Sequence, residues 1–186
     1  MNQEATSKET IIQVCHQIAA TQGLETLTMR RVAEQCGIAP GTLYNYYSNK
    51  DDLLIATVES IWKEIFHGDE GRETVESFPA YVNRLFDRAK NGAVKYPHFI
   101  TAHSAAFAKS KEGQAKSTME QYFDHMKAGM LAALQADPQV NETAFSPSFP
   151  QSAFIDFVLD NILLLLIRKN ESCTILIDMI HRVIYL

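Results

Sequence analysis

The segment from Thr28 to Lys50 restricts the possible folds of this chain most strongly, because it holds two very short helical patterns on either side of a glycine. Thr28 can cap the first helix, since its hydroxyl can accept a hydrogen bond from an amide one turn later. Val32, Ala33 and Cys36 follow at helical spacing and form an apolar stripe. The pattern predicts a first helix of about two turns.

A tight turn and a second short helix follow. Gly37 stands where a helix ends in the left-handed conformation, and Pro40 suits the first position of a new helix. We expect this helix to run from about Pro40 to Tyr47, with Leu43 and Tyr47 facing inward. The residues left on its exposed or flanking faces are Gly41, Thr42, Tyr44, Asn45 and Tyr46.

Two short helices joined by a glycine turn form the helix-turn-helix pattern, whose second helix enters the major groove of DNA. A longer helix is expected next, from about Lys50 to Phe66. Asn49 is a good cap for it, and Asp51 and Asp52 suit the positive end of its dipole. The segment therefore predicts a DNA-binding module.

Several motifs in this window resemble the TetR/AcrR family of bacterial repressors over about Ser7 to Phe66. They are Thr28-Met-Arg-Arg-Val-Ala, Gly37, Gly41-Thr42-Leu43-Tyr44, Tyr46-Tyr47 and Asn49-Lys50-Asp51-Asp52-Leu53. The resemblance implies contacts to phosphates or the neighbouring backbone for Thr42, Tyr44 and Lys50. It implies base-edge or close groove contacts for Arg30, Gly41, Asn45 and Tyr46. Thr28 completes the candidate DNA-binding set.

The net charge of −5 is unusual for a DNA-binding protein. Residues 1–50 carry four basic and four acidic side chains, which sum to zero, so the acidic excess lies beyond residue 50. These eight residues are Lys8, Arg30, Arg31, Lys50, Glu4, Glu9, Glu25 and Glu34. DNA affinity is expected to depend on a local patch and on dimerisation, with a modest salt dependence.

The whole chain is expected to be all-α, with about nine helices. We expect a helix-turn-helix domain with its connecting helix at 7–67 and a regulatory and dimerisation domain at 68–186. Helices are predicted at about 7–21, 75–95, 112–135, 151–169 and 173–186, with one more starting at Pro97. The long loop between the helices ending near 135 and starting near 151 is expected to be mobile or functional.

The last two predicted helices are apolar on several faces, so they should be buried on several sides. A four-helix interface in a two-fold homodimer would bury them, which the resemblance also implies. The expected interface residues are Phe154, Val158, Ile162, Leu165, Leu166, Ile177, Ile180 and Ile184. Two recognition helices about 34–36 Å apart would read a pseudo-palindromic operator in double-stranded DNA. A membrane-surface hairpin is the alternative, but its basic flanks are missing.

Aromatic and methionine side chains are frequent in the middle helices, where the resemblance implies a cavity for a small-molecule effector. Such side chains suit a hydrophobic or aromatic ligand. The candidates are Phe99, His103, Phe107, Met119, Tyr122, Phe123, Met126 and Phe157, with His98 as a further polar group. The alternative is that this stripe is plain core. Ligand binding is expected to tilt the Lys50–Phe66 helix and to change operator affinity.

Other classes of function find little support in the sequence. No phosphate-binding loop, dinucleotide fingerprint, nucleophile elbow or zinc-protease motif occurs, so no enzyme activity or cofactor is expected. No metal site is expected either, because no two histidines stand four apart and no cysteines have ligand spacing. The three cysteines, Cys15, Cys36 and Cys173, are expected in the core.

No stretch reaches the roughly 20 apolar residues that span a bilayer, and Met1 to Thr10 lacks a signal-peptide core, so a cytoplasmic protein is expected. A helical adaptor without DNA binding stays an alternative. So does a DNA-binding protein that is regulated by a partner or is independent of any ligand.

Asn45 departs from the family pattern, which often has an aromatic residue there, and an asparagine can bond an adenine edge in bidentate fashion. We predict that Asn45→Ala relaxes discrimination at one base pair of the operator by about 1–3 kcal/mol. Competition binding with operators changed at single positions measures this. An equal loss of affinity on every sequence would contradict the assignment.

Overall fold

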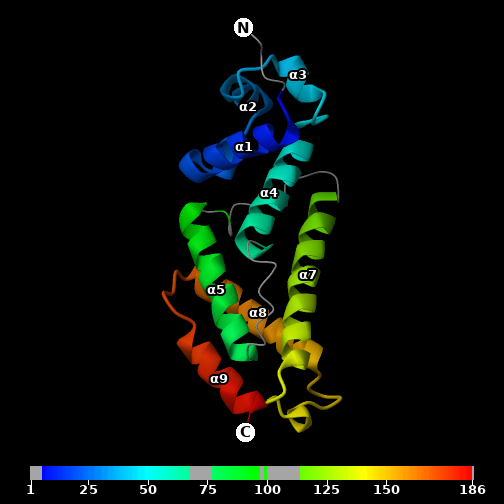
Figure 1. Cartoon of the computed structure of the whole chain (residues 1–186), viewed down its shortest axis with the longest axis vertical. Helices are drawn as coiled ribbons and strands as arrows, with labels where there is room; N and C mark the ends of the chain where they lie inside the picture. The colour runs from blue at the N-terminus through cyan, green and yellow to red at the C-terminus, as the bar shows by residue number, and fades with distance from the viewer. Residues whose placement is uncertain (1–5, 68–76, 97–98, 100–113, 186) are drawn as a thin grey trace. The chain divides into compact units, whose positions relative to one another are not determined.

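The computed structural model describes residues 6–67, 77–96, 99 and 114–185. Over these ranges it holds eight α-helices, two short 3-10 helices and one isolated bridge between Ser146 and Phe149, which confirms the all-α fold. The chain forms two compact units (Figure 1). Unit 1 comprises Met1–His67 and Gly92–Thr118, and unit 2 comprises Gly68–Asn91 and Met119–Leu186. The division into a DNA-binding domain at 7–67 and a regulatory and dimerisation domain at 68–186 stays a prediction.

Unit 1 begins with the helices that the sequence predicts. They are α1 (Lys8–Gln22), α2 (Met29–Gln35), α3 (Pro40–Tyr44) and α4 (Lys50–His67). The 3-10 helix η1 (Leu24–Thr26) lies between α1 and α2 and was not predicted. Ser7 caps α1 by accepting the Thr10 amide at 3.2 Å. Asn49 caps α4 in the same way, with its Oδ1 2.9 Å from the Asp52 amide.

The core of unit 1 lies between α1, α2, α3 and α4. Its fully buried side chains include Ile11, Cys15, Ile18, Val32, Ala33, Leu43, Leu53, Val58 and Ile61. Ile12 and Val14 are only half-buried, although both are large apolar residues of α1. Helix α1 turns the Ile11–Cys15–Ile18 stripe inward, so these two residues fall at its edge.

The last turn of α5 extends unit 1 beyond residue 67. A β-carbon added at Gly92 would lie 2.5 Å from Cδ1 of Ile65, so a larger residue here would require the Ile65 side chain on α4 to move. Tyr96 and Phe99 are also buried, at 1% and 2% exposed. The Phe99 ring centroid lies 5.5 Å from that of Trp62. This short segment therefore packs on the connecting helix.

Unit 2 is built from α5 (Phe78–Lys95, as far as Asn91), α7 (Gln114–Ala136, from Met119), α8 (Gln151–Ile167) and α9 (Thr174–Ile184). The 3-10 helix η2 (Glu142–Ala144) lies in the connection between α7 and α8. The core contains Phe78, Val82, Phe86, Met130, Leu134, Phe154, Val158, Ile180 and Ile184. These elements confirm the predicted helices near 75–95, 112–135, 151–169 and 173–186 to within a few residues.

The connection from α7 to α8 is held in place by Asp137, which is only 5% exposed. Its carboxylate accepts the amides of Phe78 at 2.8 Å and Gln139 at 3.0 Å, and also the Tyr185 hydroxyl. Burial alone would raise the pKa of Asp137, but these hydrogen bonds lower it overall. One ionised side chain thus joins the start of α5, the loop after α7 and the end of α9.

The eight side chains predicted for the dimer interface need a correction. Phe154, Val158, Ile162, Leu166, Ile180 and Ile184 are at most 9% exposed, and other side chains of the same chain cover them. Leu165 and Ile177 are half-buried. Because both faces of these helices are apolar, the sequence pattern pointed to the inner face. The exposed large apolar side chains here are Phe157, Leu164, Ile167, Ile175 and Met179.

The cysteine prediction holds for two of the three residues. Cys15 and Cys173 are buried, whereas Cys36 in the turn after α2 is only half-buried. Burial raises the pKa of the Cys15 thiol to about 11, which keeps it protonated. Over the described ranges, no helix is long and apolar enough to cross a membrane.

We predict that Asp137→Ala lowers the free energy of unfolding by about 2 kcal/mol or more, because it leaves buried donors unpaired. Urea denaturation followed by circular dichroism measures this. In the wild type the contribution of Asp137 should be present at neutral pH. It should be lost as the pH falls below the ordinary value of 3.8, because the pKa is lowered in the folded state.

Asp87→Ala is the matched control. Asp87 is 51% exposed, and its contacts on α5 are a 3.8 Å ion pair with Lys90 and an exposed 3.2 Å hydrogen bond from Asn83. Because both contacts face solvent, its loss should change stability by less than about 0.5 kcal/mol. Equal effects of the two substitutions would contradict the role of Asp137.

Candidate nucleic-acid interface

The turn between α2 and α3 is closed by two backbone hydrogen bonds. The Ile38 amide donates to the carbonyl of Ala33 at 3.0 Å, and the Gly37 amide donates to that of Glu34 at 3.1 Å. Gly37 has φ +66°, the left-handed conformation that glycine adopts without penalty. Thr28 begins α2 by accepting the Arg31 amide at 3.2 Å. The predicted cap and turn are both confirmed.

Helix α3 is shorter than predicted and is held from below by side chains. It ends at Tyr44, because the amides of Asn45 and Tyr46 bond to carbonyls three residues back and tighten the last turn. Leu43 is fully buried and Tyr47 is 8% exposed, as expected from their spacing. These two side chains set the rotation of α3, and with it the residues that it exposes.

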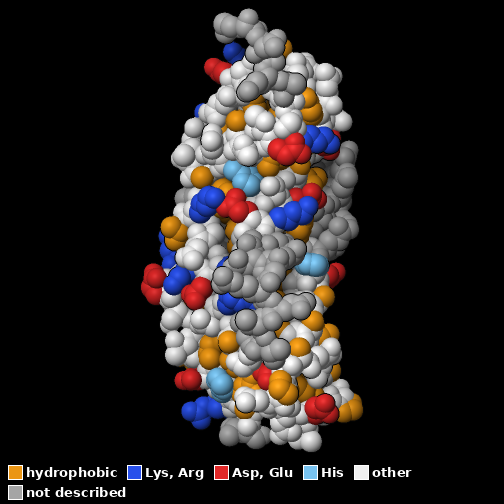
Figure 2. Space-filling model, in the orientation of Figure 1, with side chains coloured by type: hydrophobic (Ala, Val, Ile, Leu, Met, Phe, Trp, Pro, Cys, Tyr) orange, Lys and Arg blue, Asp and Glu red, His pale blue; other side chains and the backbone are white. Residues whose placement is uncertain are grey.

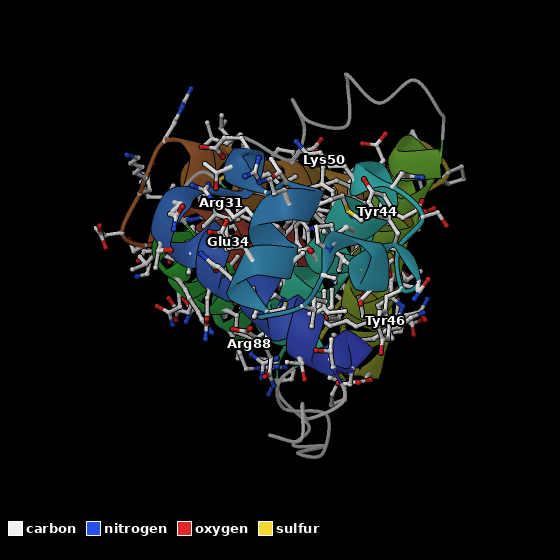
Figure 3. The ribbon with its side chains drawn as sticks, turned by 90° about the horizontal axis from the view of Figure 1, so that it is seen from above. Arg31, Glu34, Tyr44, Tyr46, Lys50 and Arg88 are labelled. Carbon is white, nitrogen blue, oxygen red and sulfur yellow. The ribbon has the colours of Figure 1, made fainter. Side chains whose placement is uncertain are left out.

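Most of the candidate DNA-binding residues are exposed around α3. The exposed ones are Thr28, Arg30, Gly41, Tyr44, Asn45 and Lys50, whereas Thr42 and Tyr46 are half-buried. Figure 3 looks onto α2 and α3, with Tyr44 and Tyr46 on one side and Arg31 and Glu34 on the other. The space around Gly41 is open, with nothing within 4 Å of an added β-carbon. Glycine is therefore not needed at position 41 for folding.

The positive charge near α3 comes from a few unpaired cations. Lys8, Arg30 and Lys50 are exposed, and none of them makes an ion pair with another described residue. Arg31 is different, because its guanidinium donates to the Thr26 carbonyl at 3.2 Å and so braces η1. On the face shown in Figure 2, acidic and basic side chains are intermixed.

Tyr46 makes a contact that sequence reasoning missed. Its hydroxyl donates to the backbone carbonyl of Thr6, 40 positions earlier, at the entry to α1. No local pattern signals such a distant partner. The hydroxyl that was expected in the DNA groove is therefore engaged within the chain.

A polar cluster was also missed, formed by His16 of α1, Glu64 of α4, and Lys95 and Tyr96 at the end of α5. Glu64 Oε2 lies 3.2 Å from His16 Nδ1 and 2.8 Å from the Tyr96 hydroxyl that donates to it. Lys95 pairs with the other Glu64 oxygen. His16 Nε2 is buried and has no hydrogen-bond partner within the described ranges.

Burial and hydrogen bonding together set the charge states of His16 and Glu64. Burial lowers the pKa of His16 below its ordinary 6.5, against the opposing effect of Glu64. Burial alone would raise the pKa of Glu64, but the hydrogen bonds from Lys95 and Tyr96 lower it overall. A neutral histidine thus faces an ionised carboxylate, and the cluster joins α1, α4 and the segment after α5.

The candidate effector residues that the structure describes differ in their burial. Phe99 is buried against Trp62, and Phe157 is 50% exposed on the outer face of α8. On α7, Met126 is buried, while Tyr122 and Phe123 are half-buried. His98, His103, Phe107 and the side chain of Met119 lie outside the described residues.

One small hollow of about 120 Å³ lies between α7 and α8. It is lined by Lys127, Ala128, Leu131, Ser152, Ile155 and Asp156, none of which was a candidate. Lys127 and Asp156 form an ion pair of 2.7 Å at its edge. For metals, the described part of the chain contains no group of three or more His, Cys, Asp or Glu side chains that could hold an ion.

Comparisons with known proteins agree with this geometry. Residues 11–57 match the family described as bacterial regulatory proteins, tetR family. Nucleoid occlusion factor SlmA of Pasteurella multocida (strain Pm70) is 23% identical over 64% of this chain and 61% of its own length. An HTH-type transcriptional regulator of Staphylococcus aureus (strain bovine RF122 / ET3-1) is 30% identical over 28% and 29%. Both matches thus span less than two thirds of the relative's length.

A solved structure is similar over nearly the whole fold. It is BioQ with its natural double-stranded DNA operator, which matches with a TM-score of 0.64 and 17% identity over 94% of this chain and 95% of that one. Together with the exposed α3, these matches define the protein as a helix-turn-helix DNA-binding protein. More narrowly, residues 11–57 match the DNA-binding domain of the tetR family of bacterial regulatory proteins. Regulators of this family are typically not enzymes.

We predict that Gly37→Ala lowers the free energy of unfolding by about 1–2 kcal/mol, because a β-carbon disfavours the left-handed conformation even in open space. Gly37→Asn is the matched variant and should lose less, since asparagine tolerates this conformation better. Thermal and urea unfolding measure both. Equal losses for alanine and asparagine would contradict the conformational explanation.

Proposed function

We propose that this protein is a homodimeric repressor that binds a pseudo-palindromic operator through α3 and is released by a small hydrophobic or aromatic effector. The observation that carries the proposal is the exposed surface of α3. Leu43 and Tyr47 anchor this helix from below, while Gly41, Tyr44 and Asn45 stay uncovered. A helix this short gains its stability from packing, so its outer face is free to serve recognition.

The exposed groups around α3 suit the two kinds of DNA contact. Tyr44 and Lys50 offer a hydroxyl and an ammonium group for phosphates, which position the protein on the duplex. Asn45 can read a base edge, and Gly41 lets the helix backbone approach the groove closely. Arg30 and Thr42 complete the contacts that we assign. The hydroxyl of Tyr46 is bonded to the Thr6 carbonyl, so we do not assign it a contact with DNA.

The dimer interface that we propose is the outer face of the two C-terminal helices. Phe157, Leu164 and Ile167 follow each other at spacings of seven and three on α8, so they share one face. Ile175 and Met179 do the same on α9, four residues apart, and are 81% and 49% exposed. Contact between two copies through both faces would remove these apolar side chains from water.

A two-fold dimer explains how a nearly neutral module could find one site in a genome. One recognition helix supplies only a handful of contacts, whereas two helices bind half-sites about one DNA turn apart. The BioQ structure holds a natural operator of that protein, which supports the same use of the fold here. Location in the cytoplasm follows from this function.

Release by an effector would act through α4. This helix begins at the Asn49 cap directly after the α3 region, and its far half contacts Gly92, Lys95 and Tyr96 through Ile65 and Glu64. A ligand that moves the segment after α5 would thereby move α4. A coupling of about 1–3 kcal/mol changes operator affinity 5- to 150-fold. Operator binding that no hydrophobic or aromatic compound alters would contradict this half of the proposal.

We predict that Gly41→Ala weakens operator binding by roughly tenfold or more, because the added methyl group separates α3 from the groove (about 1.4 kcal/mol). The free energy of unfolding should be unchanged or higher, because alanine has a higher helix propensity than glycine. A gel shift with DNA from upstream of its own gene, together with a melting curve, tests both statements. Unchanged DNA affinity would mean that the α3 backbone does not approach DNA.

We predict that Ile175→Glu converts the dimer to a monomer, because a carboxylate buried without a partner is strongly unfavourable. Sedimentation velocity measures the change. Val94→Glu is the matched control, since Val94 of α5 is 76% exposed and outside the proposed interface. If both variants stay dimeric, or if the wild type is a monomer, the interface assignment is wrong.

A further inference from the structure

Two neighbouring tyrosines after α3 contact the segment that leads into α1. The hydroxyl of Tyr46 donates to the carbonyl oxygen of Thr6. The Nζ atom of Lys8 lies 5.9 Å from the ring centroid of Tyr47. We call the residues Thr6–Lys8 the entry segment. This segment therefore contacts the turn after α3 through two neighbouring residues, Tyr46 and Tyr47.

The entry segment has a defined backbone. Ser7 is extended, with φ −111° and ψ 165°, and its side chain caps α1 by accepting the Thr10 amide. The direction of the segment at Thr6 is then set by Tyr46, which is half-buried in the turn after α3. Without the hydroxyl of Tyr46, only the cap at Ser7 and the weak contact of Lys8 with a tyrosine ring would orient it.

Lys8 is the charged group that this arrangement presents. It is exposed and makes no ion pair with a described residue. The neighbouring carboxylate of Glu9 accepts hydrogen bonds from a backbone amide and from Ser7, which lower its pKa, and the charge of Lys8 adds a smaller effect in the same direction without a close ion pair. Because residues 1–50 sum to zero charge, each unpaired cation next to α3 is a large share of the local attraction for phosphates.

We propose that Tyr46 is a positioning residue that holds the entry segment beside α3, so that Lys8 contacts a DNA phosphate next to the groove read by α3. The inference rests on the proposed DNA-binding function. It assigns Tyr46 a role through Thr6 instead of a contact with a base edge, and it adds Lys8 to the DNA-contacting residues. A phosphate contact of this kind adds affinity without sequence preference.

The salt dependence of operator binding tests this inference in the full-length protein. Each phosphate contact contributes about 0.9 to the slope of log affinity against log salt. Lys8→Gln should therefore reduce the slope by about 0.9 for each bound protomer, and affinity about fivefold per protomer near 0.15 M salt. Tyr46→Phe, which removes only the hydroxyl, should lower the slope in the same direction. The double variant should be no worse than Lys8→Gln alone.

Lys63→Gln is the control for loss of a surface cation, because Lys63 is exposed on α4 and does not belong to the entry segment. The salt slope of operator binding by this variant should equal that of the wild type. A Tyr46→Phe protein that keeps the wild-type slope, or that loses discrimination between bases, would overturn the inference in favour of direct reading. So would an unchanged slope for Lys8→Gln. A wild-type protein that binds no operator at all would contradict the proposed function itself. A wild-type protein that binds its operator, with variants that give any of these overturning results, would contradict only the role of Tyr46 and Lys8.

Discussion

Burial of Leu43 beneath α3 is the interaction on which the functional surface depends. A helix of five residues has no stability of its own, so its existence and its rotation both come from this packing. Leu43 is completely covered, and Tyr47 closes the same side one turn later. The outward direction of Gly41, Tyr44 and Asn45 is a consequence. The left-handed turn at Gly37 and the caps at Thr28 and Asn49 then hold α2 and α4 around that anchor.

Unit 1 contains more than the helix-turn-helix and its neighbouring helices, because residues from Gly92 onward also pack into it. Gly92 allows α5 to approach α4, and the cluster of His16, Glu64, Lys95 and Tyr96 fastens that approach with charge and hydrogen bonds. The hydrogen bonds and ion pairs among these four side chains favour this arrangement of α1, α4 and the end of α5. In the proposed function, a signal would reach α1 and α4 through this cluster.

The parts of the fold that depend on neighbours in sequence could be predicted, and the parts that depend on distant partners could not. The caps, the glycine turn and Pro40 are local signals, and the structure confirms them. The bond from Tyr46 to Thr6 and the cluster around Glu64 join positions 31 to 80 apart, and no spacing rule predicts them. On α8 and α9 both faces are apolar, so the pattern could not tell the covered Phe154 from the exposed Phe157.

Selection of binding sites from random double-stranded DNA, using the full-length protein, tests the central claim most directly. The account predicts enrichment of a pseudo-palindrome whose half-sites stand about one helical turn apart, because two α3 helices related by a two-fold axis read it. Recovery of an unpaired half-site would contradict the dimer, and a pool with no enriched sequence would contradict recognition by α3 itself.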